Sequence, residues 1–217
     1  MAENMLDRLL MTLDVSIDAF AICEVNAGLQ LVARPCNDIE VHYVLQGTMH
    51  LTVPGQSPLQ CGPGSIVLVP PHMAQTIGAD DSPGRELMAM ESCSVRPSGM
   101  MYFDATGGEP NIGPNDLKFV CGTISASISG SFGLLDTVRR PIVENLGDMP
   151  VVRASYELMT AEIAKPDLGS RALTGALMKA CLLLLLRRHF GRSDHETSLL
   201  STLRDVRLGK AVTAVLD

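Results

Sequence analysis

Glu40 and His42 are the two residues in this sequence whose types and spacing most directly permit binding chemistry. They lie two residues apart in the segment EVHYVLQG, whose alternating apolar residues predict a β-strand. Alternate residues of a strand point to the same side, so the carboxyl group and the imidazole are expected on one face. If that face is interior, the pair can hydrogen-bond a small molecule or take part in a metal site. Alternatively, the two side chains satisfy each other or face water at the rim of a barrel.

The elements that position this pair are predicted to be short strands. Alternating apolar residues predict strands at Ala19–Glu24, Leu29–Ala33, Glu40–Leu45, Thr48–Val53, Ile66–Val69, Leu87–Ser92 and Leu117–Thr123. Gly, Pro, Asn and Asp separate the early strands, and strands spaced this closely predict a closed sandwich or barrel. Residues 96–116 are dense in Gly and Pro and show no period, so this segment is predicted to be a long loop.

After Pro150 the period of the apolar residues becomes helical. One apolar stripe consists of Val152, Tyr156, Met159 and Ile163, and a second helix is predicted to begin near Ser170 and to stop at Gly191. The run from Leu182 to Leu186 makes the end of the second helix apolar all round, so more than one of its faces should be covered. We therefore expect an antiparallel helical hairpin that packs against both the barrel and a second subunit. The candidate dimer-interface residues are Leu173, Leu177, Cys181 and Leu184.

Composition narrows the class of protein. The chain has 217 residues, a net charge of −7 and no long basic run, which argues against a large nucleic-acid footprint of its own. Its six cysteines are dispersed without a C-x-x-C pair, and no secretory signal opens the sequence, so reduced thiols in a cytoplasm are expected. The longest apolar run is too short and too interrupted to span a membrane.

The spacing of the turn residues resembles the cupin superfamily. Glu40 and Gly47 have the six-residue spacing of the first cupin motif, and Gly64 and Pro70 match the second motif. The resemblance implies an α+β protein, in which a double-stranded antiparallel β-barrel (jelly roll) precedes the helical hairpin. The metal-binding histidines of the two motifs are replaced. The two histidines of the first motif fall near Arg34 and Cys36, and the histidine of the second falls at Gln75.

These replacements favour a receptor over an enzyme. The candidate effector-binding residues are Arg34, Cys36, Glu40, His42 and Gln75. An interior Arg34 would favour an effector that carries a carboxylate or a phosphate. Cys36 would act as a redox or electrophile sensor if its pKa were lowered. No metal and no cofactor is expected, because Gln is a poor ligand for zinc or iron. The alternatives are a metal-dependent cupin enzyme (a dioxygenase or isomerase) and a stand-alone cupin binding protein.

Further segments, in order, resemble the effector-binding half of AraC-type transcription regulators. These segments are MLDRLL, HYVLQG, FVCGTI from Phe119, LLLLLRRHF and LRDVRLGKA from Leu203. The resemblance implies a small-molecule-sensing, dimerising domain that binds DNA only through a helix-turn-helix domain beyond the last of these segments. The expected organisation is a barrel with a short N-terminal helix over residues 1–148, the hairpin over 149–192, and a linker with the start of a further helix over 193–217.

The chain also contains twelve methionines, an unusually adaptable apolar residue type. Met88, Met90, Met100 and Met101 are close together in sequence. They are candidates to line an adaptable apolar cavity, and ordinary core packing is the alternative.

Overall fold

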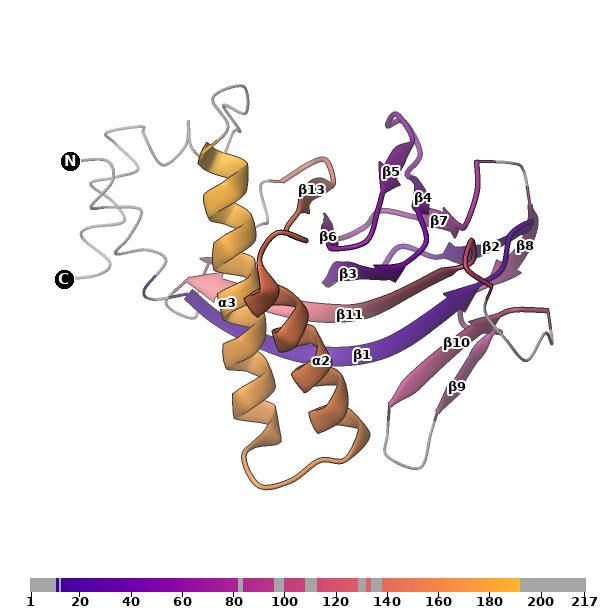
Figure 1. The fold of residues 1–217 in the computed structure, drawn as a ribbon. Coiled ribbons are helices and arrows are strands. Elements are labelled where there is room, and N and C mark those ends of the chain that lie inside the picture. The colour runs from indigo at the N-terminus through magenta and orange to yellow at the C-terminus, as the bar shows by residue number, and fades with distance from the viewer. Residues whose placement is uncertain are drawn as a thin grey trace.

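The computed structural model describes residues 11, 13–81, 84–95, 100–107, 113–128, 132–133 and 138–191, in which two β-sheets are covered on one side by two helices (Figure 1). The linker predicted for residues 193–217 lies outside the described residues. So does the helix predicted over residues 3–12, apart from Met11, which is helical. Within the described part of the chain, no helix is both long enough and apolar enough to cross a membrane.

The strands form a two-sheet sandwich. The larger sheet has the order β13 (Ile142–Asn145), β6 (Ser65–Val69), β3 (Ile39–Gln46), β11 (Leu117–Ile128), β1 (Leu13–Val25), β10 (Met101–Ala105) and β9 (Cys93–Val95), with β12 (Phe132–Gly133) on β11. The smaller sheet has the order β5 (Leu59–Cys61), β4 (Met49–Thr52), β7 (Gln75–Gly78), β2 (Leu29–Ala33) and β8 (Arg85–Met88). The described pairs are antiparallel except β1–β10 and β2–β8, which are parallel. The predicted jelly-roll barrel is confirmed.

The larger sheet has an apolar core on each face. On β3, Val41 and Tyr43 belong to the core beside the helices, whereas Val44 belongs to the core between the two sheets. On β1 the alternation changes, because the register with β11 shifts between Ile17 and Ala19. Such a bulge inserts one extra residue and so reverses which side chains face which side. Through the bulge, the odd-numbered residues of β1 belong to the core beside the helices before it (Leu13, Val15) and to the core between the sheets after it (Ala21, Cys23).

Two antiparallel helices cover the outer face of the larger sheet (Figure 1). They are α2 (Pro150–Ala164) and α3 (Ser170–Gly191), which confirms the predicted hairpin. The ring of Tyr156 on α2 stacks on that of Tyr43 on β3, with centroids 4.1 Å apart and an interplanar angle of 8°. Leu182, Leu185 and Leu186 are buried in the same core, so the apolar end of α3 is covered largely by its own chain.

Hydrogen-bonded polar side chains also connect the end of α3 to the segment before α2. Nδ1 of His189 lies 2.9 Å from Oε1 of Glu144, and both side chains are buried. The guanidinium of Arg188 donates two hydrogen bonds to the carboxylate of Asp148, at 2.8 and 2.7 Å. The orientation of the hairpin is therefore set by directed bonds as well as by apolar packing.

The prediction of one long loop over residues 96–116 was wrong in part, because Met101–Ala105 forms strand β10. This strand pairs in parallel with the C-terminal half of β1, Met101 lying opposite Ala21. A five-residue strand whose partner lies about eighty positions earlier leaves little local pattern. Residues 96–99 and 108–112 of the predicted loop are outside the described residues. Strands β5, β7, β9, β12 and β13 were also missed.

Candidate functional site

A cavity of about 450 Å³ opens between strands β2 and β8 of the smaller sheet and strands β1, β10 and β11 of the larger sheet. Three of the five predicted effector-binding residues line it, namely Arg34, Cys36 and Glu40. Arg34 is exposed, whereas Glu40 is largely buried. The cavity therefore has a cationic group that water can reach and a carboxyl group deeper in its wall.

The other two predicted residues lie behind Glu40 and form a hydrogen-bonded chain with it. Nε2 of Gln75 donates to Oε2 of Glu40, and Oε1 of Gln75 lies 2.9 Å from Nε2 of His42. Since the amide oxygen of Gln75 can only accept, His42 must carry its proton on Nε2. Nδ1 of His42 is then a buried acceptor that has no partner among the described residues. The prediction that Glu40 and His42 share one face is confirmed, and of the alternatives left open by the sequence, the structure places this face in the interior, with the two side chains linked through Gln75.

Burial shifts the pKa of both ends of this chain in opposite directions. It raises the pKa of Glu40 to about 7, although the hydrogen bond from Gln75 acts to lower that pKa. It lowers the pKa of His42 to about 4, so the imidazole is neutral at pH 7. Near neutral pH the carboxyl of Glu40 is present in both protonation states. It can therefore donate a hydrogen bond to a ligand below pH 7 and only accept one above it.

Replacing Glu40 by glutamine is expected to stabilise the protein at pH 8 and to change little at pH 4.5. The pKa of Glu40 in the folded protein lies above its value of 4.5 in an unfolded chain, so ionisation of this carboxyl group favours unfolding. Its contribution to the free energy of unfolding is therefore fully present below pH 4.5 and is lost as the pH rises through 7. Glutamine stays neutral, so the variant should gain about 1–3 kcal/mol over wild type at pH 8. Urea unfolding at both pH values measures this difference. Glu157→Gln, at an exposed carboxyl on α2, is the control, and a Glu40→Gln gain that did not depend on pH would contradict the assignment.

The polar groups of this site do not fit the metal centre that the cupin motifs would otherwise build. Among the described residues, no group of three or more His, Cys, Asp or Glu side chains is placed to hold a metal ion. His42 is the imidazole of the site, and its Nε2 donates to Gln75 and so has no lone pair to offer. The lone pair of its Nδ1 is free, but among the described residues it is not joined by two further His, Cys, Asp or Glu side chains that could complete a metal site. Arg34, at a position where the cupin motif has histidine, cannot coordinate a cation.

Several lining residues were not predicted from their sequence positions. Phe103, Cys121 and Thr123 reach the cavity from β10 and β11, which pair on either side of β1. Met88, Met90 and Met101 also line it, which confirms the cavity interpretation for three of the four clustered methionines. The condition under which Cys36 would act as a redox or electrophile sensor is not met, because burial and Glu40 raise the pKa of its thiol.

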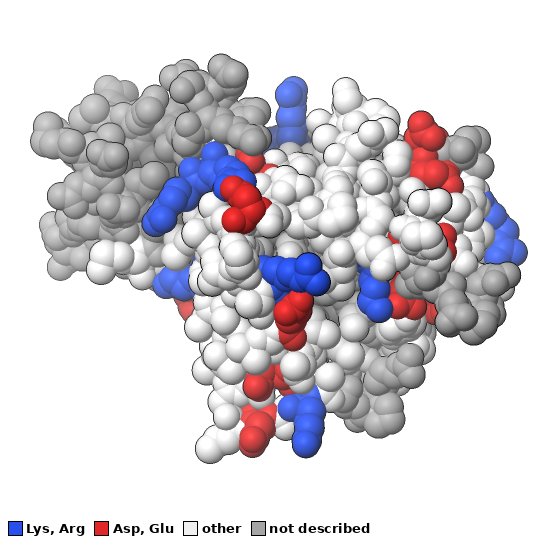
Figure 2. Space-filling view, viewed as in Figure 1, with Lys and Arg blue, Asp and Glu red and all other residues white. Residues whose placement is uncertain are grey.

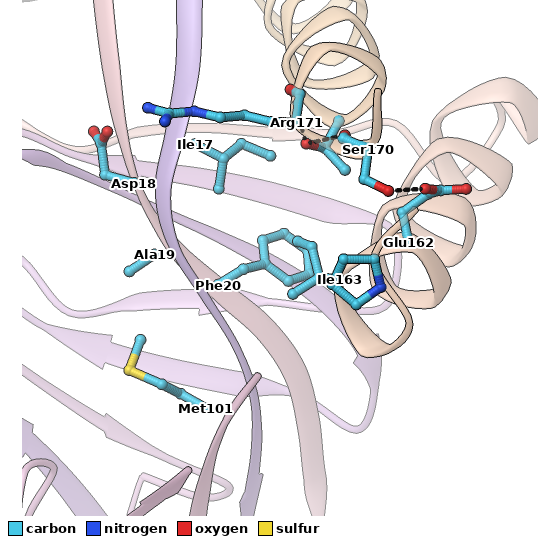
Figure 3. Close-up of a pocket in the computed structure, with 11 residues that line it drawn as sticks. Ile17, Asp18, Ala19, Phe20, Met101, Glu162, Ile163, Ser170 and Arg171 are labelled. Carbon is cyan, nitrogen blue, oxygen red and sulfur yellow. Dashed lines mark hydrogen bonds between the residues drawn. The ribbon is translucent and has the colours of Figure 1, made fainter. Parts of the chain in front are cut away.

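A second cavity, of about 410 Å³, lies between β1 and the connection of the helical hairpin (Figure 3). Phe20 and Ile163 face each other across its apolar part, and Arg171 extends from the start of α3 towards Asp18 (Figure 3). Ala19 and Met101 line this cavity as well as the first one. The two cavities therefore share part of one wall.

The predicted dimer-interface residues differ in how far they reach the surface. Leu173 is 39% exposed, and Leu177 and Leu184 are partly buried. Cys181 is 1% exposed and packs in the core of its own chain, so its side chain does not reach the surface. The dimer itself stays a prediction.

Charges on the described surface are mixed in sign. In the view of Figure 2, Lys and Arg side chains stand apart or beside Asp and Glu, and no continuous basic patch covers the described part of this face. Binding to a phosphate backbone depends on clustered Lys and Arg, and the described part of this face does not present such a cluster.

Comparison with known proteins places the chain among cupins. A sequence model of the cupin family matches residues 4–191. The solved structures it resembles include an RmlC-like cupin with a double-stranded β-helix fold from Methanocaldococcus jannaschii, with 19% identity, a TM-score of 0.30, and coverage of 51% of this chain and 69% of that one.

They also include ToxT from Vibrio cholerae. Its apo K231A form shows 10% identity and a TM-score of 0.38, with coverage of 82% of this chain and 56% of that one. Its form with bound unsaturated fatty acid shows 10% identity and a TM-score of 0.34, with coverage of 94% and 62%. This chain thus spans less than two thirds of ToxT, and no curated protein sequence matches it. The match over most of its length shows that the chain belongs to the cupin family.

Proposed function

We propose that this chain is the small-molecule-sensing and dimerising regulatory domain of an AraC-type transcription regulator, and that it does not bind DNA by itself. The observation that carries the proposal is the cavity of about 450 Å³ to which Arg34, Cys36 and Glu40 contribute. His42 and Gln75 hold Glu40 from behind through the hydrogen-bonded chain. The order of the segments that resemble AraC-type regulators, from MLDRLL to LRDVRLGKA, supports the regulatory role.

The lining of the cavity favours an organic acid with an apolar body as the effector. Its volume lies within the roughly 300–1,000 Å³ of pockets that hold small organic molecules. Met88, Met101 and Phe103 supply an apolar wall, which suits the body of such a molecule. Arg34 would bind its carboxylate or phosphate through paired hydrogen bonds, and Glu40 would donate a further one in its protonated form.

The shared wall gives a route by which an effector would act on the hairpin. Met101 and Ala19 line both the effector cavity and the cavity beside the hairpin connection. A ligand that displaced the flexible Met101 side chain would change the packing against Phe20 and Ile163. In the dimer, Leu173 and its neighbours on α3 would transmit that change to the second subunit. Such coupling requires the effector to bind the two arrangements with different affinity.

Replacing Arg34 by alanine is expected to weaken the binding of an organic acid by about 10- to 100-fold, since hydrogen bonds to charged groups contribute about 1.5–3 kcal/mol. Carboxylic acids and phosphate esters are screened by native mass spectrometry, which also reports whether the protein is a dimer. The affinity of each hit is then measured by calorimetry. Arg85→Ala, on β8 and away from the cavity lining, is the matched control.

For an anionic effector, affinity should also fall as the pH rises through about 7, because Glu40 becomes charged. Glu40→Gln should remove this pH dependence. If Arg34→Ala and Arg85→Ala lowered affinity equally, or if no organic acid bound, the proposed site would be wrong.

A further inference from the structure

Two cysteines lie side by side in the interior of the barrel, where the wall of the cavity is formed. Cys23 is on β1 and Cys121 is on the neighbouring strand β11, and their Sγ atoms are 3.0 Å apart. Cys121 is paired with Ala21, two residues before Cys23, so the two thiols occupy diagonal positions on one face of the sheet. A disulfide has an S–S distance of about 2.05 Å, so the sulfur atoms would have to approach by about 1 Å. Because Cα atoms at diagonal positions are about 7–8 Å apart, the two strands would also have to move slightly towards each other.

The two thiols differ in how a reagent reaches them. Cys121 is half-buried and lines the cavity of about 450 Å³. Cys23 is 1% exposed and lies behind it in the core between the two sheets. Burial, together with its hydrogen bond to Cys121, raises the pKa of Cys23, so Cys23 remains a thiol. Of these two sulfur atoms, a small oxidant that enters the cavity therefore meets that of Cys121 first.

We propose that Cys23 and Cys121 are a redox-reactive pair, which a small hydroperoxide entering the cavity converts into a disulfide. In the first step, the thiolate of Cys121 attacks the terminal oxygen of the hydroperoxide. The O–O bond breaks, Cys121 becomes a sulfenic acid, and the leaving oxygen takes up a proton as an alcohol, or as water from hydrogen peroxide. In the second step, Cys23 transfers its proton to the hydroxyl of the sulfenic acid as its sulfur attacks the sulfenic sulfur, so that the S–S bond forms, the S–O bond breaks and the hydroxyl leaves as water.

The pair would thus lose two electrons and two protons, and one hydroperoxide would be reduced. The new bond would draw the sulfur of Cys121 from the cavity wall towards β1. Gly122 and Thr123, which follow on β11, line the same cavity, so oxidation would alter the shape of the cavity. The chemistry of the pair does not depend on which molecule the cavity binds, so it stands apart from the proposed effector.

The test is peptide mapping of the folded, reduced chain after treatment with hydrogen peroxide. Remaining thiols are alkylated with iodoacetamide before digestion. The expected result is one cross-linked peptide pair that joins Cys23 to Cys121, a loss of two hydrogen atoms from the intact mass, and full reversal by dithiothreitol. A sample that is oxidised while unfolded in urea is the control. There the fold does not hold the two cysteines together, so disulfides between Cys23 and Cys121 should no longer predominate.

Three cysteine variants test whether the cross-link forms because the two sulfur atoms are neighbours or only because thiols are accessible from the cavity. Cys36→Ser removes another thiol that lines the cavity and should leave the cross-link unchanged. Cys23→Ser should leave Cys121 without a partner, so that its sulfenic acid is trapped by dimedone. Cys121→Ser should abolish oxidation of Cys23. The proposal is overturned if wild-type Cys121 gains oxygen without forming the link, if it pairs with Cys93 instead, or if peroxide oxidises Cys36 and leaves both partners reduced.

Discussion

Replacing Gly64 by alanine is expected to lower the free energy of unfolding by roughly 2–5 kcal/mol, which combines the cost of a left-handed backbone with that of a steric clash. Gly64 precedes β6 and has a φ of 83°. A Cβ atom there would lie 2.5 Å from Cα of Gly147 and 2.8 Å from its nitrogen, and both are backbone atoms. Because these are backbone atoms, turning a side chain cannot relieve the contact. The two segments are also held together by the hydrogen bond that Leu146 N–H donates to the carbonyl of Gly64 at 2.9 Å. Urea unfolding of the purified variant measures the loss.

Gly55→Ala provides the matched control for this prediction. Gly55 has a φ of 77°, but a Cβ atom there would meet nothing within 4 Å. Its replacement carries only the conformational cost, roughly 1–2 kcal/mol. A loss for Gly64→Ala no greater than that for Gly55→Ala would show that the turn does not approach the segment before α2 as closely as described.

Truncating Tyr156 to alanine is expected to destabilise the protein by about 3–5 kcal/mol, the range for removing a large buried aromatic ring. Tyr156 is 1% exposed and stacks on Tyr43, so its loss leaves a cavity between α2 and the larger sheet. The same change should weaken the docking of the hairpin. Guanidinium unfolding gives the total loss, and hydrogen exchange of the α2 amides shows whether the hairpin opens first.

Two variants distinguish the contribution of the stacked ring to stability from that of the Tyr156 hydroxyl and from the effect of any truncation on α2. Tyr156→Phe keeps the stacking and removes only the hydroxyl, which lies 3.9 Å from the sulfur of Met178, so its cost should be about 1 kcal/mol or less. Leu158→Ala lies on the same helix at a 42% exposed position and should cost less than about 0.5 kcal/mol. If Tyr156→Phe were as damaging as Tyr156→Ala, the stacking would not be the source of the stability.

The elements with strong local patterns could be predicted from the sequence. The alternation in β3, the glycine turn before β6 and the helical stripe from Val152 to Met159 each need only neighbouring residues to be recognised. The candidate site followed partly from the same local rule, since Glu40 and His42 share a face because they are two residues apart. Gln75 was included only because its position matched that of a cupin histidine.

What could not be predicted depends on contacts between distant parts of the chain. Strand β10 is defined by its parallel pairing with β1, and Met101 reaches both cavities only because of that pairing. The raised pKa of Cys36 follows from its burial and from Glu40 in the folded chain. The neighbouring sulfur atoms of Cys23 and Cys121 are ninety-eight positions apart in sequence. None of these features leaves a periodic signal in the sequence around it.

The bulge in β1 has a consequence for the tolerance of this strand to insertions and deletions. Leu13 and Val15, before the bulge, belong to the core beside the helices, and Ala21 and Cys23, after it, belong to the core between the sheets. An insertion or deletion of one residue within either half of the strand would turn the residues beyond it to the opposite face. Removal of Asp18, the extra residue of the bulge, would instead leave both halves on their present faces, because Ile17 and Ala19 pair with the successive residues Ile124 and Thr123. Substitutions that keep the apolar pattern should therefore be accepted far more readily than a change in length away from the bulge. Related sequences that keep this architecture should vary in composition along β1 but hold the residue count of each half constant.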